Sequence, residues 1–181
     1  MSHSPVNDEL TLFSYEVLGL VGDGGLGAHE LKRMVEQGRI LAWAGESQYY
    51  TEPKRLARLG YLSAAQAPGK TRPRVVYTLT EKGRAALAAY ARTAVRVLPV
   101  KSDALLRLLI CDLVGEDATR KSLATVRADV ADLRRRLDDA EQSARALPHR
   151  EPYLLLVVSF LRRYLDLHLE LVDQAERVLV R

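Results

Sequence analysis

Basic side chains concentrate in one segment of the sequence, between Ser47 and Arg84. This segment holds eight lysine or arginine residues and only two glutamates. Residues 1–100 as a whole hold 13 basic against 9 acidic residues, whereas residues 101–181 hold 14 of each. A basic region beside a neutral one suggests that the first contacts a polyanion and the second does something else. Many solvated surfaces are also basic, so charge alone leaves both interpretations open.

The basic segment begins with an expected helix whose two sides differ in chemistry. On a wheel at about 100° per residue, one side is largely apolar and carries Tyr49, Tyr50, Pro53, Leu56 and Ala57. We expect Tyr50 to be a core residue with its hydroxyl at the rim, and we leave the place of Tyr49 open. The other side carries cationic and hydrogen-bonding groups, namely Ser47, Gln48, Thr51, Lys54, Arg55 and Arg58. Such a face fits the major groove of DNA and reaches base edges; the alternative is a solvated helix face.

A β-hairpin is expected after this helix. Residues 61–65 and 74–78 have the composition of strands, and a Pro/Gly-rich stretch connects them. The connection and its flank carry Lys70, Arg72 and Arg74. A basic hairpin tip neutralises phosphates beside the groove and releases counterions. Thr80 follows as the expected N-cap of another helix, with Glu81 in its first turn.

Two further helices are expected before the basic segment, at residues 10–21 and 27–37, where apolar residues recur at helical spacing. Three helices followed by a hairpin and another helix are the order of a winged helix-turn-helix. We therefore expect a mostly α-helical chain with a DNA-binding domain at residues 1–98, made of three helices and a two-stranded wing.

Three motifs resemble the PadR family of bacterial repressors. They are Gly27 to Leu31 (GAHEL), Tyr50 to Leu62 (YTEPKRLARLGYL) and Tyr77 to Gly83 (YTLTEKG). The sequence departs from the family pattern at Ala28 and His29, at Thr51 and at Pro53, where tyrosine, proline and leucine are usual. The resemblance continues into residues 101–114 and implies a winged-helix repressor with a long helical C-terminal arm.

The C-terminal region, residues 99–181, is expected to be a helical dimerisation domain. From Leu123 to Leu147, apolar residues recur in steps of three and four, which is a heptad seam that Pro148 ends. The last expected helix, residues 151–180, carries two apolar stripes, and a helix with two such stripes must be covered on two sides. One stripe includes Phe160, Tyr164 and Leu167. We assign dimerisation to the other, which includes Leu154, Val158, Leu161, Leu165, His168 and Val172.

The resemblance also implies partners. A two-fold homodimer is expected to bind double-stranded DNA at a pseudo-palindromic operator as a repressor. Release by a small aromatic effector is implied by the family, and Phe13, Tyr15 and Trp43 are the candidate lining. The alternatives are a different winged-helix sensor family and a helical interaction protein whose winged domain binds a protein instead of DNA.

Other classes lack their signatures. Cys111 is the single cysteine, and the four histidines have no metal-ligand spacing, so we expect no disulfide and no metal. No phosphate-binding loop, His-Glu-x-x-His motif or nucleophile elbow occurs, so we expect no enzyme, no catalytic residues and no cofactor. The start has no apolar signal core and no apolar run spans a bilayer, so we expect a cytoplasmic protein.

Overall fold

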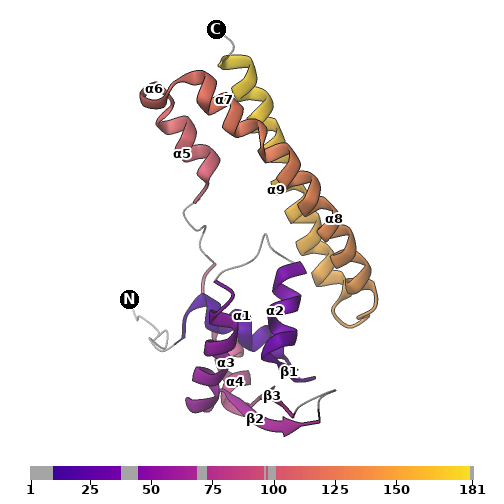
Figure 1. The fold of residues 1–181 in the computed structure, drawn as a ribbon. Helices are drawn as coiled ribbons and strands as arrows, with labels where there is room; N and C mark the ends of the chain where they lie inside the picture. The colour runs from indigo at the N-terminus through magenta and orange to yellow at the C-terminus, as the bar shows by residue number, and fades with distance from the viewer. Residues whose placement is uncertain (1–9, 38–44, 69–72, 96, 98–100, 180–181) are drawn as a thin grey trace. The chain divides into compact units, whose positions relative to one another are not determined.

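The computed structural model describes residues 10–37, 45–68, 73–95, 97 and 101–179 (Figure 1). The chain divides into two compact units. The N-terminal unit consists of Met1–Glu36 and Leu41–Arg96, and the C-terminal unit of Gln37–Ile40 and Val97–Arg181. Each unit buries hydrophobic clusters of its own. Among the described helices, none is long and apolar enough to cross a membrane.

The described part of the N-terminal unit contains the helices expected from the sequence. They are α1 (Leu12–Val21), α2 (Ala28–Gln37), α3 (Gln48–Arg58) and α4 (Glu81–Tyr90). A capping box opens α1, because the Thr11 side chain accepts from the Ser14 backbone N–H and the Ser14 side chain accepts from that of Thr11. At the start of α4, the expected N-cap Thr80 accepts a hydrogen bond from the Gly83 backbone N–H.

The wing belongs to an antiparallel sheet in the order β1-β3-β2. Its strands are β1 (Leu26–Gly27), β2 (Leu62–Ala67) and β3 (Arg74–Leu79). The winged helix-turn-helix is thus confirmed, but β1 adds a third strand to the expected two. A two-residue strand is too short to show a period of two in the sequence. The position just before β1 requires glycine. Gly25 has a φ of +70°, and a Cβ on it would lie 2.7 Å from the Thr78 methyl group.

The core of the N-terminal unit joins α1, α2, α3 and the sheet. Tyr49 and Leu56 of α3 pack there with Leu18, Leu31 and Tyr61. Tyr49 is 1% exposed and Tyr50 is 37% exposed, so the expectation that Tyr50 is a core residue was wrong. Both tyrosines lay on the apolar side of the wheel, but only Tyr49 continues the spacing of buried Pro53 and Leu56.

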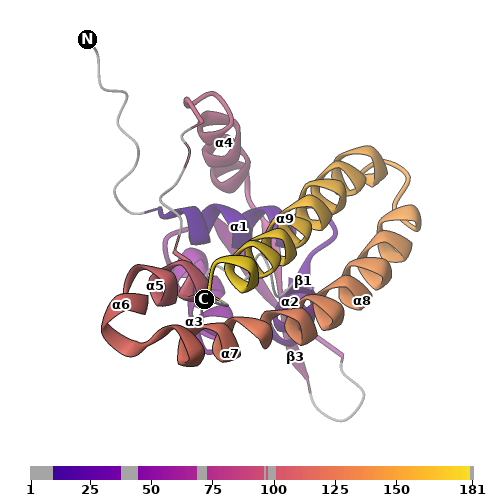
Figure 2. The ribbon, with the colours of Figure 1, turned by 90° about the horizontal axis from the view of Figure 1, so that it is seen from above.

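The C-terminal unit is entirely helical in its described part. Its helices are α5 (Asp103–Leu109), α6 (Cys111–Val114), α7 (Glu116–Ala124), α8 (Val126–Arg145) and α9 (Glu151–Val178). The expected heptad seam is therefore divided at Thr125, between α7 and α8. Figure 2 shows α7 leading into α8, with α9 beside α8. The helices α8 and α9 run antiparallel, because Arg127 pairs with Asp173 near one end and Arg162 with Asp138 nearer the other.

The two apolar stripes of α9 have different environments. Val158, Leu161 and Leu165 are buried against Val130 and Leu137 of α8 in the same chain. By contrast, Phe160 and Leu167 of the other stripe are exposed, and so are their neighbours Tyr153 and Leu156. The sequence alone could not decide which stripe faces α8, because both have helical spacing.

Candidate nucleic-acid interface

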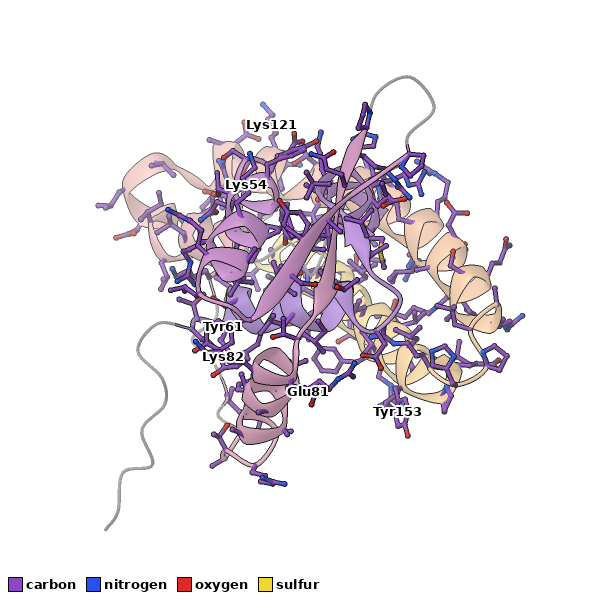
Figure 3. All side chains as sticks on the ribbon, turned by 90° about the horizontal axis from the view of Figure 1, so that it is seen from below. Lys54, Tyr61, Glu81, Lys82, Lys121 and Tyr153 are labelled. Atoms are coloured by element: carbon purple, nitrogen blue, oxygen red, sulfur yellow. The ribbon has the colours of Figure 1, made fainter. Side chains whose placement is uncertain are left out.

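One side of α3 presents polar and cationic groups to solvent. Ser47, Tyr50, Thr51, Lys54 and Arg58 are all exposed there, and Figure 3 shows Lys54 on this helix. Their spacing of three and four residues places them on one face. Among the described residues, neither Lys54 nor Arg58 has an ion-pair partner. We call these five residues the outer face of α3. Gln48 is also exposed, but its side chain accepts from the Gly45 backbone N–H at 2.9 Å.

Arg55 differs from the other cations expected on this face. Its Nε and Nη2 donate to the two carboxylate oxygens of Glu52 at 2.8 and 2.7 Å, and Nη2 also donates to Ser14 Oγ at 3.1 Å. Ser14 Oγ in turn donates to Glu52 Oε1 at 2.7 Å. The hydrogen bonds from Arg55 hold the pKa of Glu52 below its ordinary value although the carboxyl is partly buried. Arg55 thus joins α3 to α1, a role that residue type and spacing did not reveal.

A second carboxyl group lies at the contact between α1 and α3. Glu16 accepts a hydrogen bond from the Tyr49 hydroxyl at 3.2 Å. Partial burial raises the pKa of Glu16, although this hydrogen bond opposes the shift. The Phe13 ring meets the Tyr49 ring edge to face, with centroids 4.9 Å apart. The helix α3 is therefore fixed on α1 by aromatic packing and by two polar contacts.

The cations of the wing region fall into two groups. Lys70 and Arg72 lie outside the described residues. Arg74, at the start of β3, pairs with Glu30, which also accepts from the Gly27 backbone N–H at 2.8 Å. These contacts hold the pKa of Glu30 below its ordinary value, with the Gly27 hydrogen bond as the larger cause. The guanidinium of Arg74 is nevertheless 48% exposed, so it remains accessible to a phosphate.

Lys82, which follows the wing, contacts its own unit. Its Nζ donates to the Leu59 carbonyl oxygen at 2.7 Å and lies 4.2 Å from the centre of the Tyr61 ring (Figure 3). The next residue, Gly83, must be glycine, because a Cβ there would lie 2.3 Å from the Tyr61 carbonyl oxygen. This part of the third motif therefore packs α4 on the chain around Tyr61.

The residues expected to bind an effector are engaged in the N-terminal unit. Phe13 packs on Tyr49, and the Tyr15 ring stacks on Tyr90 with centroids 4.2 Å apart. Trp43 lies outside the described residues. Neither Phe13 nor Tyr15 lines the cavity described next.

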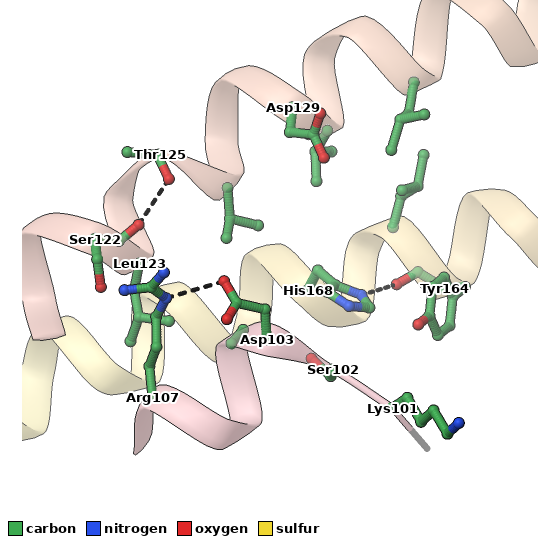
Figure 4. A pocket seen from close by; sticks show the side chains of 15 residues that line it. Lys101, Ser102, Asp103, Arg107, Ser122, Leu123, Thr125, Asp129, Tyr164 and His168 are labelled. Carbon is green, nitrogen blue, oxygen red and sulfur yellow. Dashed lines mark hydrogen bonds and ion pairs between the residues drawn. The ribbon is translucent and has the colours of Figure 1, made fainter. Parts of the chain in front are cut away.

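A cavity of about 810 Å³ lies within the C-terminal unit (Figure 4). Its apolar lining includes Val126, Val130, Leu133 and Leu165, from α8 and α9. Its polar lining includes Lys101, Arg107 and Asp103, the last two paired at 2.9 Å, and His168, whose Nδ1 lies 2.8 Å from the Tyr164 carbonyl oxygen. The volume is within the range of small-molecule sites, roughly 300–1,000 Å³.

The stripe assigned to dimerisation is largely used inside the chain. Val158, Leu161, Leu165 and Val172 are buried, and Leu154 and His168 are partly buried. The other expected stripe is only partly covered, because Phe160, Leu167 and Val178 are exposed whereas Tyr164 and Leu171 are partly buried. We define the outer stripe of α9 as five exposed apolar residues: Tyr153, Leu156, Val157, Phe160 and Leu167. A second exposed apolar group on α5 and α6 comprises Leu105, Leu106, Leu109, Leu113 and Val114.

Comparison with known proteins gives matches in structure and none in sequence. No protein-family model matches the chain, and no curated protein matches it. Bacillus subtilis PadR in complex with operator DNA superimposes with a TM-score of 0.73 at 19% identity, covering 94% of this chain and 97% of that one. The PadR-like transcriptional regulator BC1756 from Bacillus cereus gives 0.69 at 20%, covering 94% and 95%.

A third structure, Bacillus subtilis PadR in complex with p-coumaric acid, gives a TM-score of 0.66 at 20% identity and covers 93% of this chain and 97% of that one. These alignments extend over both units, and identities this low establish the fold alone. The chain therefore has the PadR fold, a winged helix-turn-helix followed by a helical C-terminal unit.

Proposed function

We propose that this chain is a PadR-family transcriptional regulator, which binds a pseudo-palindromic operator as a homodimer and represses by occupying it. The observation that carries the proposal is the outer face of α3, where Lys54 and Arg58 are exposed and without an ion-pair partner among the described residues. An α-helix fits the major groove, and exposed cations and hydroxyls on it contact phosphates and base edges. A likeness in fold to a protein crystallised with operator DNA supports this interpretation.

The homodimer is proposed from the apolar surface of the C-terminal unit. The outer stripe of α9 exposes 66% of Phe160 and 72% of Leu156. A contiguous apolar patch of this kind on a helix marks an interaction surface. A second copy is the occupant we favour, because a two-fold dimer covers both copies of the stripe at once and presents two α3 helices to two half-sites.

The test of DNA binding is fluorescence anisotropy with the intergenic DNA beside the gene of this protein, over a series of salt concentrations. The double substitution Lys54→Ala/Arg58→Ala is expected to weaken binding by about 1–3 kcal/mol for each lost base contact and to flatten the salt dependence. The control Lys121→Ala/Arg135→Ala removes two equally charged groups that are each 70% exposed on the C-terminal unit. Equal losses in both variants would contradict the proposed interface.

The same titration separates the second candidate, a winged unit that binds a protein. Binding to promoter fragments falls steeply with salt if phosphates are neutralised. Salt-independent or undetectable binding to every fragment would leave the outer face of α3 as a protein-docking surface.

We also propose a small aromatic acid as effector. The likeness to the p-coumaric acid complex of PadR supports the class. Two places compete for it: the aromatic residues Phe13, Tyr15 and Trp43, and the cavity beside Arg107. An effector acts only by binding the DNA-free form better than the DNA-bound form.

Titration with p-coumaric acid distinguishes the two places. Trp43 is the single tryptophan, so quenching of its fluorescence that survives Arg107→Ala assigns the first place. Binding that Arg107→Ala abolishes, measured by calorimetry, assigns the cavity. No binding by either method, with DNA affinity unchanged, would contradict this effector class.

A further inference from the structure

Three side chains at the contact between α1 and α3 form a closed hydrogen-bonded triangle. Arg55 donates to both oxygens of Glu52 and to Ser14 Oγ, and Ser14 donates to Glu52. Ser14 Oγ also accepts from the Thr11 backbone N–H at 3.0 Å, within the capping box of α1. The triangle therefore connects the first turn of α1 to the middle of the recognition helix.

This triangle is set into the protein surface. Ser14 is fully buried, and the side chains of Glu52 and Arg55 are 12% and 34% exposed. A bidentate pair between guanidinium and carboxylate is the strong, directional form of ion pair. If Arg55 turned outward, the Glu52 carboxylate would remain largely buried with only Ser14 to stabilise it. Moving Arg55 out of this ion pair therefore costs free energy, whereas reorienting an exposed lysine or arginine does not.

Arg55 lies at the edge of the outer face, and its contacts turn its side chain away from that face. At about 100° per residue, Arg55 is about 100° from Lys54 but only about 60° from Arg58. The contact with Ser14 identifies this side as the one that faces α1. Two cations of α3 thus face outward, and the third is neutralised by a carboxylate three residues before it.

We propose that Glu52 and Ser14 withhold Arg55 from DNA, so that Arg55 is a positioning residue which fixes the orientation of α3. This inference rests on the proposed DNA-binding function. A mobile arginine beside the groove binds any phosphate and adds affinity for all sequences alike. Holding Arg55 in the protein keeps non-specific binding low and keeps Lys54 and Arg58 in a fixed register on the DNA. Glu52 thereby determines specificity without touching DNA.

The experiment measures the salt dependence of binding for the full-length protein, on operator DNA and on a scrambled duplex. Arg58→Ala is expected to reduce the slope by about one unit, as the loss of one phosphate contact does. Arg55→Ala should weaken operator binding and leave the slope and the scrambled-duplex affinity unchanged. This difference distinguishes positioning from direct contact. A loss of stability would not produce it under conditions in which every variant is fully folded.

Glu52→Gln gives the more telling result, because the nearly isosteric amide keeps the size of the side chain but removes the charge and one of the two acceptors for Arg55. Arg55 is then expected to reach phosphate, which raises the slope by about one unit and the affinity for scrambled DNA roughly eightfold at 0.1 M salt. The double variant Glu52→Gln/Arg55→Ala should lose that gain. Arg55→Lys, which cannot form the bidentate pair, should lower operator affinity as Arg55→Ala does.

Two outcomes would overturn this proposal alone, and a third would overturn it together with the proposed function. A slope that falls in Arg55→Ala as much as in Arg58→Ala would place Arg55 on DNA and leave the proposed function intact. An affinity for scrambled DNA that Glu52→Gln does not raise would show that Glu52 withholds nothing. If the wild-type protein bound no DNA at any salt concentration, the proposed function would fail and this inference with it.

Discussion

The helix pair α8–α9 and the helix α3 use their basic residues in different ways. In the C-terminal unit, arginines on α7 and α8 and Arg162 of α9 pair with carboxylates, and several of these pairs join α8 to α9. In the N-terminal unit, Lys54 and Arg58 have no such partner among the described residues. The apolar residues show the reverse: α3 buries Tyr49 and Leu56, whereas α9 exposes Phe160 and Leu156.

This difference indicates two kinds of partner. Unpaired cations on a helix are suited to a polyanion, and an uncovered apolar stripe is suited to another apolar surface. Net charge by region already pointed to this division, because residues 101–181 are neutral. Only contacts show that many of the charges there pair with one another, and that one cation of α3, Arg55, is paired in the same way.

The largest expected effect is the loss of the C-terminal unit on substitution of Leu165 by aspartate. Leu165 is 2% exposed and packs against α8, so an unpaired carboxylate there should cost about 4 kcal/mol or more. We expect Leu165→Asp to lower helix content by circular dichroism and to leave a protease-resistant N-terminal unit. Leu165→Met, which conserves volume, should cost less than about 1.5 kcal/mol. Wild-type helix content and melting in Leu165→Asp would refute the intrachain role of this stripe.

A charge on the outer stripe should act on assembly and not on folding. Phe160 is 66% exposed, so Phe160→Asp is expected to keep wild-type helix content and to sediment as a monomer. Its operator affinity should fall by about 10²–10⁴, because each half-site is then bound without its tethered neighbour. Gln174→Asp adds the same charge at another exposed site of α9 and should remain dimeric. A dimeric Phe160→Asp protein would place the dimer interface elsewhere, with the exposed leucines of α5 and α6 as the next candidates.

The two carboxyl groups at the α1–α3 contact should give opposite dependences of stability on pH. The pKa of Glu16 is raised, so the folded state favours its neutral form, and its stabilisation is lost as pH rises from about 4.5 through the raised pKa. The pKa of Glu52 is lowered, so its stabilisation is present above about 4.5 and is lost as pH falls through the lowered pKa. Urea unfolding from pH 3 to 8 should show that Glu16→Gln stabilises the neutral-pH protein and Glu52→Gln destabilises it. The same sign for both would contradict this assignment.

The smallest effect is expected for the ion pairs between α8 and α9. Arg127 donates to Asp173 and Glu176 at 2.7 and 2.8 Å, and all three side chains are well exposed. Exposed pairs add little to stability and are screened by salt. Arg127→Ala should lower the melting temperature only slightly, and the difference should vanish at about 0.5 M salt. A large loss that persists at high salt would mean that Arg127 orders the helix pair by packing.

Hydrophobic periodicity and capping residues were sufficient to predict the helices and the wing of the N-terminal unit and their order, but not the division of the seam into α7 and α8. Thr80 as an N-cap and the apolar positions of α1 are local features, because they depend on residues within one turn. The exposed cations Lys54 and Arg58 were predicted for the same reason. The strand β1 could not be predicted, because two residues carry no period and pair only when β3 is brought beside them.

Tertiary structure decided which of two equivalent surfaces is used. The wheel placed Tyr49 and Tyr50 on the same side of α3, and packing against α1 buries only Tyr49. Residue type placed Arg55 with the exposed cations Lys54 and Arg58, and its partner Ser14 is 41 residues away in sequence. The two stripes of α9 are alike in spacing, and only contact with α8 selects the inner one. The sequence therefore determines which apolar and charged groups share a face of each helix, because helical periodicity is local. Long-range contacts determine which of these faces is buried against a neighbouring helix.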